Sequence, residues 1–185
     1  MREAPAFTDE RYVENFIKIW TAGVADEVHT YGRLRGQPLD LDKLEPLTRE
    51  MVALADSFKA TDYLEALDYL RQMARQLVAT WSEIDILLTP TVTQPPLPIG
   101  ALAPKEGEPA FQWLLNAAQW VPFTPVWNVT GQPAVSLPLH QSADGLPVGV
   151  QLVGPPAGEE LLLSLSAQLE SARPWHERRA EPAVA

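Results

Sequence analysis

The sequence predicts an incomplete α/β fold, in which helices come first, a few short strands follow, and a helix closes the chain. Two observations predict it. Helical periodicity dominates residues 1–84, and strand-like apolar runs occur only after residue 85. The predicted strands number three, too few to cover three or four helices, and their apolar character is typical of strands inside a larger sheet. We therefore expect the other strands of that sheet to lie elsewhere.

The first predicted helix covers residues 9–29, with Thr8 or Asp9 as its N-cap. Its large apolar side chains recur at every fourth position and form one stripe: Tyr12, Phe16, Trp20, Val24 and Val28. Because a stripe of this kind normally faces a core, we expect Trp20 to be buried.

Two further helices are predicted before residue 85. A short one follows Pro46 and ends near Phe58. A long one opens at Asp62 and Glu65, a pair that resembles a capping box, and its apolar residues alternate spacings of four and three up to Ile84. The repeat is too short to favour a coiled coil, so we interpret it as a long amphipathic helix against a core that includes Trp81.

The periodicity changes after this helix. Residues 86–88 form a short apolar run that stops at Pro90, which is typical of a buried strand entering a loop. Mostly irregular backbone is expected for residues 90–109, and a short helix for residues 111–120. Residues 134–139 and 148–153 have strand character, and Asp144-Gly145 between them is a turn dipeptide that predicts a hairpin or two neighbouring strands.

The last helix is expected to begin at Glu159 and Glu160, whose charges suit the positive end of a helix, and to stop near Pro174. We expect one region over residues 1–185. Within it, residues 1–84 are mainly helical, 85–158 hold strands and proline-rich loops, 159–173 form a helix, and 174–185 are a tail.

Composition excludes several function classes. The formal net charge is −10, which disfavours binding to nucleic-acid phosphates. No uncharged apolar run reaches the ~18 residues of a membrane span. The chain has no Cys, its three His residues are isolated, and no phosphate-binding glycine motif occurs. We therefore expect no metal, no cofactor, no nucleic acid, no membrane association and a cytoplasmic location.

The charges are unevenly distributed. Residues 1–85 carry 26 of the 38 charged side chains, whereas residues 86–143 carry three. A proline-rich stretch that is also apolar and aromatic is expected to pack against its own domain, a ligand or other protein. An alternative is therefore a non-catalytic binding or scaffold module that docks through residues 86–143. A second alternative is a Pro-x-x-Pro ligand at Pro95–Pro98.

Three blocks of sequence resemble the C-terminal part of the amidase signature family. They are the Asp85–Thr91 block D-I-L-L-T-P-T, the block F-T-P-V-W-N-V-T-G-Q-P-A-V-S-L-P-L at 123–139, and G-L-P-V-G-V-Q-L-V-G at 145–154. The Leu-Leu pair that follows Glu160 fits as well. The blocks stand in the family's order and cover at least residues 81–170. The resemblance implies a large mixed sheet surrounded by helices.

The resemblance also implies a reaction. Members of the family hydrolyse linear amides with a nucleophilic Ser, a cis-Ser and a Lys, and backbone N–H groups stabilise the oxyanion. All three catalytic residues belong to the family's N-terminal half, and this sequence has no Ser-Ser dipeptide. We therefore expect the C-terminal portion of an amide hydrolase, with no catalytic residue of its own and no activity alone. A small-molecule amide would be its substrate once an N-terminal half completes it.

The resemblance implies that this chain forms part of the substrate pocket. In the family, the loops after the Thr-Pro-Thr strand and around the Asn-x-x-Gly-x-Pro segment lie close to the substrate. An apolar wall with a few polar groups is also typical of a small-molecule site. For any single residue, a place in the core is an equally good interpretation. The predicted substrate-binding residues are Pro90, Thr91, Trp120, Phe123, Thr124, Trp127 and Asn128.

Overall fold

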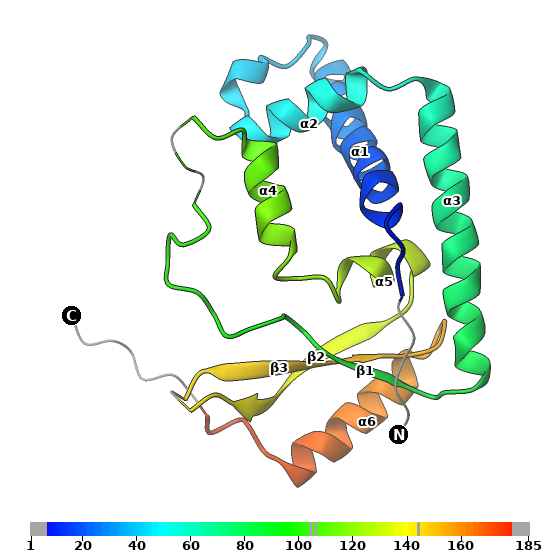
Figure 1. The fold of residues 1–185 in the computed structure, drawn as a ribbon, viewed down its shortest axis with the longest axis vertical. Helices are drawn as coiled ribbons and strands as arrows, with labels where there is room; N and C mark the ends of the chain where they lie inside the picture. The colour runs from blue at the N-terminus through cyan, green and yellow to red at the C-terminus, as the bar shows by residue number, and fades with distance from the viewer. Residues whose placement is uncertain (1–6, 104, 106, 144, 179–185) are drawn as a thin grey trace. The chain divides into compact units, whose positions relative to one another are not determined.

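A computed structural model describes residues 7–103, 105, 107–143 and 145–178. The predicted α/β class is confirmed, with helices first, then a small sheet, then a C-terminal helix (Figure 1). The chain divides into two compact units. The helical unit comprises residues 1–77 and 97–119, and the sheet unit comprises residues 78–96 and 120–185. None of the helices in the described part is long and apolar enough to cross a membrane.

The described residues of the helical unit form four α-helices and a 3-10 turn. They are α1 (Tyr12–Arg35), η1 (Leu41–Lys43), α2 (Pro46–Asp56), α3 (Ala60–Ala79) and α4 (Ala110–Ala118). Only the last two residues of α3 belong to the sheet unit. Pro46 occupies the first turn of α2, where its missing N–H leaves no helical bond unmade. Gly36 ends α1 with a φ of 72°, a left-handed conformation that glycine adopts without steric cost.

Of the predicted aromatic stripe on α1, Tyr12 is buried and Phe16 is half-buried, but Trp20 is exposed. Thr21, Ala25 and Gly32 are buried, whereas Trp20 is 41% exposed, so its predicted burial is wrong. Small side chains allow another element to approach the helix axis closely, which excludes a bulky ring from the same contact. Thr21 stays satisfied at this buried position because its hydroxyl donates to the carbonyl of Ile17 at 2.8 Å.

One carboxylate joins α2 to α4. The two oxygens of Glu50 accept the backbone N–H groups of Ala110 at 2.9 Å and Phe111 at 2.7 Å. These are among the donors at a helix start that lack a partner inside the helix. A negative charge there also interacts favourably with the helix dipole, so Glu50 caps α4 from a distant part of the sequence.

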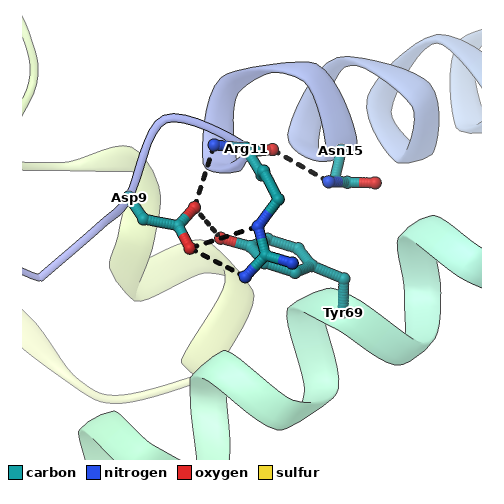
Figure 2. Close-up of polar contacts among 4 residues, drawn as sticks. All are labelled: Asp9, Arg11, Asn15 and Tyr69. Carbon is teal, nitrogen blue, oxygen red and sulfur yellow. Dashed lines mark hydrogen bonds and ion pairs between the residues drawn. The ribbon is translucent and has the colours of Figure 1, made fainter.

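A second polar cluster joins the start of α1 to α3 (Figure 2). Asp9 accepts the Tyr69 hydroxyl at 2.5 Å and the Arg11 Nη2 group at 3.0 Å. The Arg11 guanidinium lies 4.8 Å from the centre of the Tyr69 ring, and the Asn15 side chain donates to the Arg11 carbonyl. Asp9 thus lies before α1, which begins at Tyr12. Its carboxylate accepts the Arg11 N–H at 2.9 Å as well as the Tyr69 hydroxyl, and Arg11 rather than Thr8 or Asp9 is the N-cap residue.

Hydrogen bonding and burial shift two pKa values in this cluster. The hydrogen bond from Tyr69, followed by that from Arg11, lowers the pKa of Asp9 below its ordinary value. Burial and the hydrogen bond to Asp9 raise the pKa of Tyr69 to about 12. Both shifts favour the pair as drawn, a carboxylate accepting from a neutral phenol.

The long helix differs from its prediction at both ends. It begins at Ala60 rather than Asp62, and Asp62 in its first turn accepts the N–H of Lys59 at 2.9 Å, the reach-back half of a capping box. It ends at Ala79, and a 3-10 turn, η2 (Thr80–Ser82), follows.

Three strands and two α-helices occur in the described residues of the sheet unit. They are β1 (Leu87–Pro90), α5 (Pro125–Thr130), β2 (Ala134–Gln141), β3 (Pro147–Val153) and α6 (Glu159–Ala172). The strand order is β1-β3-β2 and both pairings are antiparallel. The predicted neighbouring strands are therefore confirmed as the pair β2–β3. Of the predicted turn dipeptide, Asp144 lies outside the described residues and Gly145 has a φ of 79°.

The two faces of this sheet differ in chemistry. On one face, Leu137 and Leu152 pack with Leu162 of α6 and form an apolar core. The register places Thr89, Gln151 and Ser136 side by side on the other face, which we call the polar face. Figure 1 shows α5 and α6 on opposite sides of the sheet.

Helix α5 was not predicted, because six residues are too few to show a helical period.

Candidate functional site

Two hydroxyl groups meet above the central strand of the polar face. Thr91 follows β1, and its Oγ1 lies 2.6 Å from the Oγ of Ser136 on β2. Gly149 of β3 lies between them and accepts the Thr91 N–H at 3.1 Å through its carbonyl. A Cβ on Gly149 would lie 2.7 Å from Thr91 Oγ1 and 2.8 Å from Ser136 Oγ, so a glycine is needed for this hydroxyl contact.

A buried glutamine binds the segment 120–128 to the sheet. The side-chain amide of Gln151, 4% exposed, donates to the Thr89 hydroxyl at 3.0 Å and to the Phe123 carbonyl at 2.9 Å. Buried polar groups of this kind are costly unless paired. Gln151 therefore satisfies Thr89 on β1 and at the same time holds Phe123 over the polar face.

Segment 120–128 is held at further points. The N–H and the hydroxyl of Thr93 donate to the Trp120 carbonyl at 3.1 and 3.4 Å. Thr124 precedes α5, whose first residue is proline, and Gly131 ends α5 in the left-handed conformation. The Gln132 amide, also buried, donates to the Gly154 carbonyl at 2.8 Å.

The predicted site residues differ in exposure. Trp127 is 4% exposed and meets Trp81 edge-on, with ring centroids 5.8 Å apart, so it is a core residue of the sheet unit. Trp81 is half-buried, which agrees with its predicted packing role. Pro90 and Asn128 are exposed. The remaining four are half-buried: Thr91, Trp120, Phe123 and Thr124.

The chemistry of this group is neutral and polar. The side chains that face one another here are hydroxyls, one amide and aromatic rings, and none of them is ionisable. In the described residues, no cluster of three or more His, Cys, Asp or Glu side chains could hold a metal ion. A hollow of about 560 Å³ lies in the helical unit near the end of α1, and none of the predicted site residues lines it.

Three residues of the polar face were missed as site candidates. Ser136, Gly149 and Gln151 all occur within the strands predicted from their apolar neighbours. The signal that could have found them is a polar or glycine residue inside an otherwise apolar strand. Such a residue needs a partner or a close approach to justify its place.

The chain matches known proteins along most of its length. The family model described as Amidase matches residues 6–163. A 6-aminohexanoate-cyclic-dimer hydrolase of Paenarthrobacter ureafaciens is 37% identical over 183 residues, which cover 95% of this chain and 37% of the relative. The protein of the same name from Pseudomonas sp. (strain NK87) is 36% identical over 181 residues.

The fold has a counterpart among solved structures. A structure of 6-aminohexanoate cyclic dimer hydrolase matches with a TM-score of 0.82 and 35% identity, covering 91% of this chain and 36% of that chain. The chain thus spans little more than a third of the length of the curated relatives it matches.

Proposed function

This chain belongs to the amidase family, and on that premise we propose that it supplies the C-terminal portion of an amide (C–N) hydrolase. Its part in the enzyme is to complete the sheet and to form one wall of the substrate pocket. Six of the seven predicted residues form the wall, and the seventh, Trp127, supports it from the core.

The observation that carries this proposal is the attachment of segment 120–128 to the polar face. Gln151 fixes the Phe123 carbonyl at 2.9 Å, and Thr93 fixes the Trp120 carbonyl at 3.1 Å. A wall has to be rigid to select a substrate. The half-buried Gln151 bond and the Thr93 bond at the surface both restrain the backbone of this segment. The aromatic rings beside neutral polar groups suit a small, largely apolar amide.

Bond cleavage is expected to come from the rest of the enzyme. A serine nucleophile needs a base within hydrogen-bonding distance. The partner of Ser136 is the hydroxyl of Thr91, which is no base at neutral pH, and the sequence has no Ser-Ser dipeptide. We therefore assign Ser136 to binding and propose that the chain alone does not hydrolyse amides.

The substrate is proposed to be a small-molecule amide, and the relatives suggest where to begin. Two relatives that are 37% and 36% identical to the chain are named for hydrolysis of the 6-aminohexanoate cyclic dimer, so cyclic and linear amides of ω-amino acids are the first substrates to test. The scaffold-module alternative is not favoured, because the matches extend over nearly the whole chain rather than over a separate module.

Complementation tests the proposal. The chain is co-expressed with the portion of the Paenarthrobacter relative that lies outside the match, and hydrolysis of the cyclic dimer is measured against either part alone. We expect turnover only from the combination. If the two parts fold and bind each other but the complex hydrolyses no amide, the proposal is contradicted.

A matched pair of aromatic substitutions tests the wall itself. Trp120→Ala should raise the KM of the complemented enzyme, because the ring is half-buried at the wall. Tyr31→Ala removes a ring that is 57% exposed in the helical unit and should leave KM unchanged. Equal effects from the two substitutions would argue against a wall at Trp120.

A further inference from the structure

The hydrogen bond between Thr91 and Ser136 is not needed to hold β1 and β2 in the sheet. Strand β3 already pairs with both β1 and β2, so the sheet does not need a side-chain contact across its central strand. The contact at 2.6 Å exists because Gly149 leaves the space above β3 open. Ser136 is exposed and Thr91 is half-buried, so the pair is accessible from the polar face.

The hydrogen-bonding capacity of the pair is only partly used. Each hydroxyl has one proton and two lone pairs. A single bond between them uses one proton and one lone pair, so the accepting hydroxyl still has a proton to donate, and both oxygens can accept. A ligand group that offers one acceptor and one donor would complement them, and a carboxamide offers both, its C=O and its N–H.

The surroundings favour a neutral ligand. The side chains in register on this face are hydroxyl, amide or apolar, and none carries a positive charge that would balance a carboxylate. The chain as a whole has a formal charge of −10, which disfavours anions further.

The pair also lies next to the proposed wall. Thr93, two residues after Thr91, is bonded to the Trp120 carbonyl. Gln151, which faces Ser136 in the register, is bonded to the Phe123 carbonyl. A ligand held by the hydroxyls would therefore contact segment 120–128 as well.

We infer that the Thr91–Ser136 hydroxyl pair, held open by Gly149, is a recognition site for the neutral carboxamide group of the substrate. The inference rests on the proposed function and adds to it the atoms that hydrogen-bond to the amide group of the substrate. It distinguishes an amide from a ketone of the same shape, which lacks the N–H donor, and from a carboxylate, which is charged.

The test uses the isotope-labelled 185-residue chain and three probes with the same ring: benzamide, acetophenone and benzoate. Each is titrated while backbone amide signals are followed by NMR. We expect benzamide to bind most tightly of the three and to shift the signals of Thr91, Ser136 and Gly149. Equal affinity for the three probes would overturn the inference.

Substitutions identify the atoms. Thr91→Val and Ser136→Ala should each weaken benzamide binding about threefold to tenfold, the usual worth of one hydrogen bond, and should abolish the preference over acetophenone. Thr91→Ser keeps the hydroxyl and should bind like the natural chain. Ser57→Ala removes an exposed hydroxyl in the helical unit and should leave the affinity for benzamide unchanged.

The outcomes separate this inference from the proposed function. The inference is overturned if benzamide shifts only the NMR signals of segment 120–128, or if its affinity is unchanged in both hydroxyl variants. Neither result contradicts the proposed pocket wall. Absence of saturable shifts throughout the sheet unit also overturns it, and the complementation assay then decides the proposed function by itself. If a variant fails to fold, the order of the three probes on the natural chain still decides.

Discussion

Replacing Gly149 with alanine tests the geometry of the polar face most severely. The added methyl group would lie 2.7 Å from one hydroxyl oxygen and 2.8 Å from the other, distances at which something must move. Overpacking of this kind costs about 1–3 kcal/mol. Separation of Thr91 from Ser136 would forfeit a hydrogen bond of about 0.5–1.5 kcal/mol. We therefore expect the substitution to destabilise the sheet unit by about 2–4 kcal/mol.

Native-state hydrogen exchange is the appropriate assay, because it reports stability strand by strand in a chain of two units. Exchange of the β3 amides should accelerate in Gly149→Ala. Gly23→Ala is the matched control: Gly23 is an exposed residue of α1 with nothing within 4 Å of an added Cβ. That substitution should stabilise α1 by about 0.5–1 kcal/mol and leave β3 unchanged.

A double substitution tests whether the two hydroxyls are what an added methyl group at position 149 would meet. In a Ser136→Ala background one of the two close contacts is absent, so Gly149→Ala should cost less than it does in the natural chain. An equal cost in both backgrounds, or no acceleration of β3 exchange at all, would refute the account of Gly149 as the residue that leaves room for the hydroxyls.

Three further predictions concern the other polar contacts. Gln151→Met leaves the half-buried Phe123 carbonyl without its donor and should destabilise the sheet unit by about 1–3 kcal/mol in urea denaturation; unchanged stability would contradict a role in holding segment 120–128. Glu50→Ala removes the cap of α4 and should cost about 0.5–2 kcal/mol, seen as faster exchange of the α4 amides, whereas Glu50→Gln should cost less. Folding lowers the pKa of Asp9, so its stabilising effect is complete above the ordinary value of 3.8 and is lost as the pH falls through the lower folded value. Tyr69→Phe should therefore reduce the melting temperature at pH 7 and have a smaller effect in strong acid; an effect independent of pH would contradict the pairing.

Much of the fold follows from periodicity and turn chemistry. The strands β2 and β3 and the helix α6 have long, clear patterns, and the structure places them within a few residues of their predicted bounds. Helix α1 shows the limit. Its large residues form a stripe of which Tyr12 is buried and Phe16 is half-buried. Trp20 of the same stripe is nevertheless exposed, whereas its small neighbours Thr21 and Ala25 are buried.

The candidate site could be predicted only in part. The wall residues were predicted from the resemblance to the family, and the aromatic, nearly uncharged composition of their segment agrees with a small-molecule site. The residues that fix the wall act over long sequence distances: Gln151 bonds Phe123, 28 residues earlier, and Ser136 meets Thr91 across 45 residues. Pairings of that kind depend on strand register, which no local pattern reveals.

The most direct test of the account is the amide turnover of the purified 185-residue chain by itself. The chain is incubated with p-nitroacetanilide and with the 6-aminohexanoate cyclic dimer, and product release is compared with buffer, in parallel with the complemented enzyme. The chain alone should release no product above buffer, and the combination should release a measurable amount. Saturable turnover by the chain alone would contradict the claim that it holds a pocket wall without the cleavage machinery, and its loss in Ser136→Ala would identify Ser136 as a nucleophile.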